Sequence, residues 1–280
     1  MPSPANRKLT SGRALMRCIV IIGVIVFAAL SPCPPASAGQ PRSEITGKDG
    51  TPMTLVPAGE FDMGSHEQEG DDDERPRHRV SLDAFYVDKY QVTNERYAKF
   101  LKKTGRSQPR DWSKVKLPAD GDLPVVGVNW QDAAAYCRWA GKRLLTEAEW
   151  EKAARGTDGR KYPWGDDEPT SRRANYGKSE NDNEAHLLPV GSLEDGKSPY
   201  DAYDMAGNVF EWVADWYDEH YYQQSPARAP KGPPQGTAKV ARGGAWDRHV
   251  FNVRSANRSA FSPVNRFKDV GMRCGKDAPQ

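Results

Sequence analysis

The chain has 280 residues, which is enough for one large domain or two small ones. Hydrophobic residues make up 37%, and the 25 glycines bring the apolar share to about 46%, an ordinary value for a globular protein. Gly and Pro together are about 17% of the chain, below the roughly 25–30% typical of low-complexity disorder, but enough to disfavour a helical bundle or coiled coil. The formal net charge of +2 gives no general case for nucleic-acid binding.

Residues 1–38 have the layout of a secretory signal peptide. Four basic residues precede a 13-residue apolar run from Cys18 to Leu30, and the small-residue triplet Ala36-Ser37-Ala38 follows. The run is shorter than the about 17–25 residues that a helix needs to cross a bilayer. We therefore expect cleavage after Ala38, an exported protein in the periplasm or medium, and no membrane span in the mature chain. The alternatives are an uncleaved anchor and a lipid-modified Cys33.

Export would leave two cysteines, Cys137 and Cys274, because Cys18 and Cys33 lie in the signal peptide. Two thiols in an oxidising compartment allow a single disulfide, and the alternative is two buried, unpaired cysteines. Their spacing does not match a zinc site, since the sequence has no CxxC motif.

The first part of the mature chain predicts short strands around one charged loop. Residues 39–51 are polar and predict a flexible leader. The charge run from Glu69 to Arg79 predicts a solvated loop. Apolar patterns predict strands at 54–56, 61–64 and 80–87.

Three helices are marked by their capping residues. The predicted N-caps are Thr93 or Asn94, Asn129, and Thr146. Thr146 and Glu149 form a capping box, in which each side chain satisfies an orphan backbone amide. Gly141 and Gly156 end the second and third helices. Beyond Gly156 glycine and proline recur every few residues, which predicts short strands at 239–242 and 271–274 and an exposed loop at 223–236.

Two clusters rich in side-chain oxygens are the strongest chemical signal. One runs from Asn175 to Glu184, and the other from Asp204 to Trp212. Calcium takes six to eight oxygen ligands, and irregular loops supply side-chain and carbonyl oxygens together. The alternative is that these acidic turn residues face solvent and cap backbone amides. Neither cluster matches an EF-hand loop.

Motifs spread over residues 52–276 resemble the formylglycine-generating enzyme family, also called sulfatase-modifying factors. The matching stretches, in family order, are 56–64, 90–94, 124–130, 134–144, 146–151, 162–165, 207–212, 242–246 and 270–274. The resemblance implies one α+β domain with little regular structure, a variant of the C-type-lectin-like fold, at 52–276, followed by a tail at 277–280. It also implies that Cys137 and Cys274 form a disulfide.

The resemblance further implies two calcium sites. The first would use Asn175, the Tyr176 carbonyl, Asp182 and the Glu184 carbonyl. The second would use Asp204, the carbonyls of Gly207 and Val209, and Glu211.

The copper ligands of the enzyme are missing from this sequence. Formylglycine-generating members hold Cu(I) with two cysteines, since thiolates suit this soft ion. The matching positions here carry Arg248 and Asn252 or Val253. Copper is therefore not expected, and whether the chain is an enzyme stays open.

The stretch that replaces the copper site keeps a candidate cleft with Trp246, Arg248 and His249. Trp supplies stacking area, and Arg holds a carboxylate or phosphate in a bidentate fork. The alternative is core aromatics with salt-bridged arginines. Three functions remain: an exported accessory that binds a peptide, protein or small molecule, a periplasmic tailoring enzyme similar to the pyoverdine-maturation branch, and a formylglycine-generating oxidase with unconventional ligands.

Overall fold

The computed structural model describes residues 42–181 and 186–279. The predicted signal peptide, with its cleavage site at Ala38, and the predicted ligands Asp182 and Glu184 lie outside the described residues. Among the residues that are described, no helix is long and apolar enough to cross a membrane.

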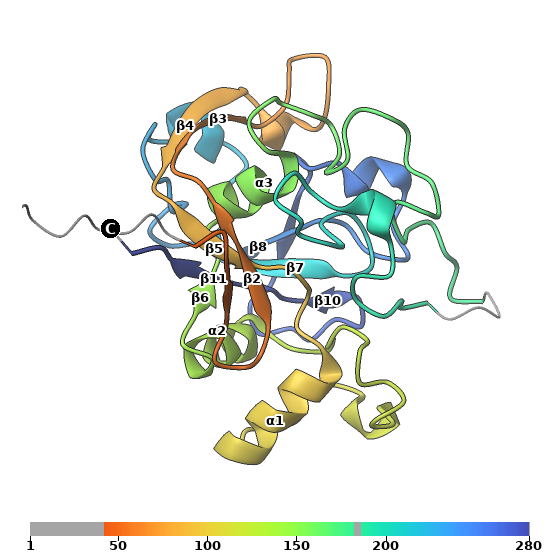
Figure 1. Cartoon of the computed structure of the whole chain (residues 1–280). Coiled ribbons are helices and arrows are strands. Elements are labelled where there is room, and N and C mark those ends of the chain that lie inside the picture. Colours follow the sequence, from red (N-terminus) through yellow and green to blue (C-terminus); the bar gives the residue numbers. More distant parts are fainter. Residues whose placement is uncertain (1–41, 182–185, 280) are drawn as a thin grey trace, which may run out of the picture. The chain divides into compact units, whose positions relative to one another are not determined.

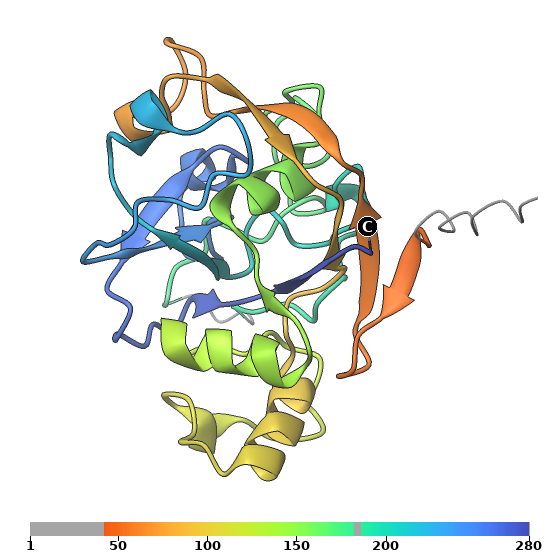
Figure 2. The same ribbon diagram turned by 90° about the vertical axis from the view of Figure 1, so that its left-hand side faces the viewer.

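The largest sheet joins the two ends of the described chain (Figure 1). Its strand order is β1-β2-β5-β11-β6, and each neighbouring pair is antiparallel. The strands are β1 (Glu44–Thr46), β2 (Pro52–Val56), β5 (Phe85–Asp88), β11 (Cys274–Asp277) and β6 (Arg143–Leu144). The last strand of the domain thus lies between strands from its first half (Figure 2).

A second sheet and a hairpin complete the β structure. The four-stranded sheet has the order β10-β7-β8-β9, in which β10 is parallel to β7. Its strands are β7 (Phe210–Trp216), β8 (Lys239–Arg242), β9 (Arg258–Phe261) and β10 (Val270–Gly271). The hairpin consists of β3 (Gly59–Met63) and β4 (His78–Leu82).

The three predicted helices form, with the predicted caps. They are α1 (Asn94–Thr104), α2 (Trp130–Trp139) and α3 (Glu147–Arg155). Thr93 caps α1, and complete capping boxes begin α2 at Asn129 and α3 at Thr146. Helices α1 and α2 pack on each other, while α3 packs on β3, β7 and β8 (Figure 1). Short 3-10 helices lie at η1 (Asp72–Glu74), η2 (Trp112–Lys114), η3 (Glu194–Gly196), η4 (Tyr221–Gln224) and η5 (Val250–Val253).

The predicted flexible leader is part of the domain from β1 onward. Strand β1 pairs with β2, and the turn that follows buries the Asp49 side chain. Asp49 accepts hydrogen bonds from Lys142 Nζ (2.7 Å) and the Tyr136 hydroxyl (2.8 Å). Lys142 Nζ also donates to Asp88 Oδ1 at 2.6 Å. A polar segment is ordered here because its carboxylate meets a buried ammonium, which local composition does not reveal.

Two other boundaries differ from the sequence prediction. The strand expected at 80–87 is two strands, because the chain leaves the hairpin after Leu82 and enters the large sheet at Phe85. The strand expected at 271–274 is divided in the same way between β10 and β11. The predicted tail begins inside β11, which continues to Asp277.

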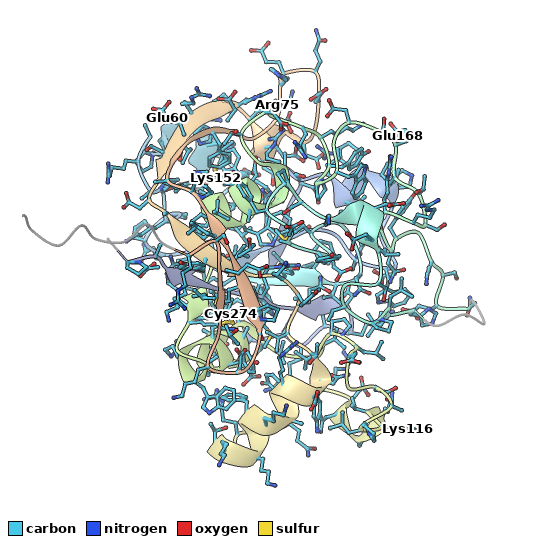
Figure 3. The ribbon with its side chains drawn as sticks, in the orientation of Figure 1. Glu60, Arg75, Lys116, Lys152, Glu168 and Cys274 are labelled. Atoms are coloured by element: carbon cyan, nitrogen blue, oxygen red, sulfur yellow. A yellow bond between two sulfur atoms is a disulfide. The ribbon has the colours of Figure 1, made fainter. Side chains whose placement is uncertain are left out.

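Cys137 of α2 and Cys274 of β11 form the expected disulfide, and both are fully buried (Figure 3 labels Cys274). Around them lies a hydrophobic cluster built by α1, α2, β7 and β10. A second cluster lies between the hairpin, α3 and β8. The mixed sheets and few helices confirm the α+β class.

Candidate functional site

The loop before β7 holds the residues predicted for the second calcium site. Asp204 and Asn208 have left-handed backbone conformations, with φ of 58° and 64°. Gly207 approaches Asn175 so closely that a Cβ atom on it would lie 2.2 Å from the Asn175 carbonyl oxygen. Only glycine fits at this position. The Asn208 N–H also donates to the Asn175 carbonyl at 2.8 Å, so the two predicted calcium loops are in direct contact.

The Glu211 carboxylate at this loop is already neutralised and saturated by protein donors. Arg273 grips it in a bidentate pair, with Nε and Nη2 each 2.7 Å from one oxygen. Trp150 Nε1 donates to Oε2 at 2.7 Å, and Gln91 Nε2 donates to Oε1 at 3.0 Å. A carboxylate offers about four lone-pair sites, and these four contacts use them. The Glu211 side chain therefore does not fit a calcium ligand.

The Asp204 side chain differs from Glu211, because it is buried and no described residue forms an ion pair with it. Its Oδ2 accepts the Gly191 N–H at 2.7 Å. Burial, together with the charge of Glu211, raises the pKa of Asp204 to about 6. The second predicted site thus contains one saturated carboxylate and one buried carboxylate with a raised pKa.

At the first predicted calcium site, the side-chain oxygen of Asn175 accepts no hydrogen bond from the part of the chain that the structure describes. The Asn175 amide nitrogen donates to the His186 carbonyl (2.8 Å) and to Asn208 Oδ1 (3.0 Å), which fixes the orientation of the amide. Its Oδ1 is buried and has no hydrogen-bond partner among the described residues. A buried amide oxygen without a donor suits a hard cation such as calcium, so Asn175 fits the predicted role. Tyr176 directly follows it in the chain, as that site requires.

The candidate cleft residues Trp246 and Arg248 lie in a polar cluster, but Trp246 is not open to a ligand. Trp246 is 4% exposed, and the His186 ring stacks on it with ring centroids 4.3 Å apart. Lys268 Nζ lies 5.1 Å from its ring centroid. We call His186, Trp246, Asp247, Arg248 and Lys268 the Trp246 cluster. This arrangement favours the alternative of core aromatics with salt-bridged arginines, because His186, 60 residues away in sequence, covers the indole.

Arg248 is held by two acidic side chains rather than left free for a ligand. Its Nη2 lies 2.6 Å from Asp269 Oδ2, and its Nε lies 3.3 Å from Asp247 Oδ1. The contact with Asp247 is an ion pair without a hydrogen bond, since Arg248 Nε and Asp247 Oδ1 have no hydrogen-bond partner among the described residues. His249 is exposed, and its Nδ1 accepts the Phe251 N–H at 3.2 Å as the cap of η5. The structure therefore brings together Trp246 and Arg248 and gives His249 a local structural role.

His186 is the residue of this cluster that sequence reasoning missed. Its Nδ1 is buried and has no hydrogen-bond partner among the described residues. An isolated histidine in an irregular stretch gave no signal, because the stacking on Trp246 joins two loops that are distant in the chain.

Charged residues also fill the core between α3, β8 and β9. Glu151 pairs with Arg242, and Glu147 pairs with Arg258. Glu74 accepts a bidentate pair from Arg254, with both distances 2.7 Å. The loop predicted to be solvated therefore contains a fully buried glutamate.

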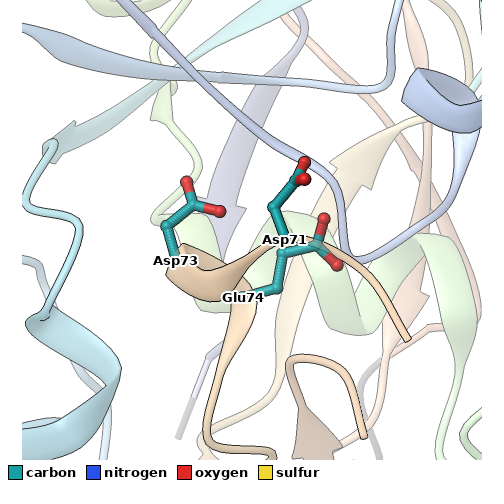
Figure 4. Close-up of side chains that lie close together, drawn as sticks. All are labelled: Asp71, Asp73 and Glu74. Atoms are coloured by element: carbon teal, nitrogen blue, oxygen red, sulfur yellow. The ribbon is translucent and has the colours of Figure 1, made fainter. Parts of the chain in front are cut away.

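An acidic group at η1 is the described cluster whose geometry most resembles a metal site. Asp71, Asp73 and Glu74 have carboxylate oxygens within 4.8 Å of one another (Figure 4). Glu74 is bound to Arg254, and Asp73 accepts the Tyr217 hydroxyl at 2.7 Å. A cavity of about 520 Å³ lies beside them, lined by further acidic residues and by Arg75 and His220. Two of the three carboxylates thus already have protein partners.

Asp215 of β7 and Lys239 of β8 are two further buried titratable groups. Asp215 Oδ2 accepts the Glu147 N–H at 2.8 Å. Burial, together with the charge of Glu147, raises the pKa of Asp215 to about 8. Lys239 Nζ lies 4.2 and 3.9 Å from the ring centroids of Trp130 and Trp216, and burial lowers its pKa to about 8.

We expect Asp215 to make the free energy of unfolding fall as the pH rises from about 4 to about 8. Over this range the folded state keeps a proton on Asp215 that the unfolded state has lost, so the slope reaches about −1.4 kcal/mol per pH unit. Asp215→Asn keeps the acceptor for Glu147 N–H and removes the titration. Urea melts at pH 5 to 8 should show its stability gaining on the wild type as the pH rises. A constant difference would contradict the raised pKa.

Comparisons with known proteins agree with this geometry. Residues 40–278 match the family described as "Sulfatase-modifying factor enzyme 1-like domain". The formylglycine-generating enzyme of Streptomyces coelicolor is 34% identical over 300 aligned positions, which cover 87% of this chain and 95% of the relative. The serine/threonine-protein kinase Pkn1 of Chlamydia trachomatis is 37% identical over 246 positions, or 81% of this chain. The chain spans only 38% of the length of that kinase.

The solved structure of PvdO from Pseudomonas aeruginosa is also similar. It has a TM-score of 0.72 and 29% identity, and the alignment covers 86% of this chain and all of PvdO. The family match begins at residue 40, in agreement with the ordered strand β1. The fold, the buried disulfide and these relatives together show that the chain belongs to the formylglycine-generating enzyme family of sulfatase-modifying factors.

Proposed function

We propose that this protein is an exported member of the family that binds a peptide, protein or small molecule as an accessory, without copper oxidase chemistry. Calcium at the Asn175 site would stabilise it. The signal-like N-terminus and the buried disulfide support export, since disulfides persist in oxidising compartments. The unpartnered Asn175 oxygen supports the calcium.

The observation that carries the proposal is that an ion-paired arginine, Arg248, occupies a position of the copper site. This residue stands where the family resemblance places the first copper-binding cysteine, and its guanidinium is paired with Asp269 and Asp247. A permanently charged cation at that position repels Cu(I) and offers it no lone pair. The two cysteines in the described chain are joined to each other and buried, so neither supplies a thiolate.

We expect the exported protein to leave the cysteine of a sulfatase-derived peptide unchanged in the presence of Cu(I) and oxygen. Mass spectrometry of the peptide and metal analysis of the desalted protein check this together. Formylglycine-generating enzyme from Streptomyces coelicolor serves as the positive control. One equivalent of tightly held copper, together with aldehyde in the peptide, would overturn the proposal.

A second candidate is a tailoring enzyme similar to the pyoverdine-maturation branch. The likeness to PvdO and the position of His186 in the Trp246 cluster favour it. Histidine is the side chain whose ordinary pKa lies nearest to neutral pH, so it suits acid–base chemistry. Turnover of a metabolite that stops in His186→Phe, which keeps a ring over Trp246, would favour this candidate over the accessory.

A further inference from the structure

The amide orientation of Asn208 is fixed by backbone groups of one residue. Leu188 N–H donates to Asn208 Oδ1 at 3.1 Å, and Asn208 Nδ2 donates to the Leu188 carbonyl at 3.2 Å. A backbone N–H only donates and a carbonyl only accepts, so reversing the Asn208 amide would break both contacts. The Leu188 N–H and carbonyl therefore fix which end of the Asn208 amide is the nitrogen.

Asn208 in turn fixes the orientation of Gln91. Asn208 Nδ2 donates to Gln91 Oε1 at 3.1 Å, so the nitrogen of Gln91 must point the other way. That nitrogen, Nε2, lies 3.2 Å from the Asp204 carbonyl, 3.2 Å from the Val209 carbonyl and 3.0 Å from Glu211 Oε1. Gln91 is fully buried. One NH₂ group thus faces three oxygens that converge from the second predicted calcium loop.

Of the three oxygens that contact Gln91, only Glu211 Oε1 belongs to a charged group, and a protein cation already balances that charge. Arg273 is 1% exposed and neutralises Glu211 through two contacts, while its Nη1 donates to the Asp88 carbonyl at 3.1 Å. Calcium binds oxygens at about 2.3–2.6 Å, and it would have to displace the Gln91 amide from Val209 and Glu211. The amide cannot turn its oxygen toward such an ion without breaking the pair with Asn208.

We infer that Gln91 and Arg273 replace the cation at the second predicted calcium site, so the loop at 204–211 is held by the protein's own donors. This inference is independent of calcium at Asn175, because it concerns different oxygens. The two predicted sites are therefore not equivalent. At the first, one buried oxygen has no partner in the described segments, and the second is closed by an amide and a guanidinium.

Gln91→Glu should convert this loop to a cation-dependent one. The new carboxylate faces two carbonyls and Glu211, and a bound cation relieves that repulsion. In EDTA we expect Tm to fall by about 5–10 °C relative to the wild type, with most of the loss restored by calcium. The variant should also bind one more calcium equivalent than the wild type in titration calorimetry. Gln224→Glu, an exposed change of the same charge, should alter neither quantity.

Asp204→Asn provides a second test if Gln91→Glu does not fold. It removes the remaining carboxylate of the loop and keeps an acceptor for the Gly191 N–H. Its calcium stoichiometry should equal that of the wild type, whatever number the wild type has. The inference is overturned if Asp204→Asn loses one calcium equivalent, or if a folded Gln91→Glu keeps the wild-type Tm in EDTA. A wild type without any calcium would instead refute the proposed site at Asn175.

Discussion

Arg242→Met should lower the free energy of unfolding by about 3–5 kcal/mol, because it removes one of the two buried arginines that pair with Glu151, the other being Arg155. Arg242 and Glu151 are both fully buried and in direct contact. The guanidinium also donates to the carbonyls of Ala256 (2.7 Å) and Ser255 (3.1 Å), which would lose their donors. Urea denaturation at pH 7 measures the change.

The matched control is Arg79→Met, which removes an ion-paired arginine that is 60% exposed. Exposed pairs contribute about 0–1 kcal/mol, so this variant should unfold near the wild-type midpoint. Equal effects at the two positions would contradict the view that desolvation, and not the mere presence of an ion pair, sets the cost. The buried ion pairs join α3 to strands β8 and β9 of the second sheet. Arg242→Met should therefore also make the unfolding of α3 and of this sheet less cooperative.

Replacing both disulfide cysteines by alanine should lower the free energy of unfolding by roughly 4–5 kcal/mol. The bond closes a loop of 137 residues, and the chain-entropy account assigns that amount to a loop of this length. For a domain of this size, the corresponding fall in Tm is about 8–20 °C. Differential scanning fluorimetry of Cys137→Ala/Cys274→Ala against the oxidised wild type measures it.

Reduction provides the control for this second result. Both sulfurs are fully buried, so the wild type must be reduced in partial denaturant before its Tm is measured. The reduced wild type should then melt near the double variant, and the double variant should not respond to the reductant. An unchanged Tm in both cases would show that the disulfide does not stabilise the fold.

Local patterns were sufficient for the helices. Asn129 and Thr146 each begin a capping box that forms as predicted, because the satisfied amides lie within three residues of the cap. Strand boundaries were less well predicted, since β4 and β5 belong to different sheets although only two residues separate them. Alternation of apolar residues reports which side is buried but not which sheet receives the strand.

For the candidate sites, too, the sequence revealed the local motifs but not the contacts between distant residues. The motif of glycines and carboxylates identified the loop at 204–211, and the missing thiols at 245–254 were visible in the sequence. The sequence did not reveal that Gln91 closes that loop from 113 residues away, or that His186 covers Trp246. Neither contact has a periodic or local signature.

The amino-acid sequence by itself determined the family, the capped helices, the pairing of the last two cysteines through the resemblance, and the loss of the copper ligands. Those properties depend on residue identity and on spacing within short segments. The tertiary structure alone decided which charges are buried. Glu74 lies in the loop predicted to be solvated, Asp49 in the predicted flexible leader and Glu151 in the third predicted helix, and none of these predictions reveals burial of the charge. Their burial depends on arginine and lysine partners from distant strands and helices, and a buried charge is stable only where such a partner meets it.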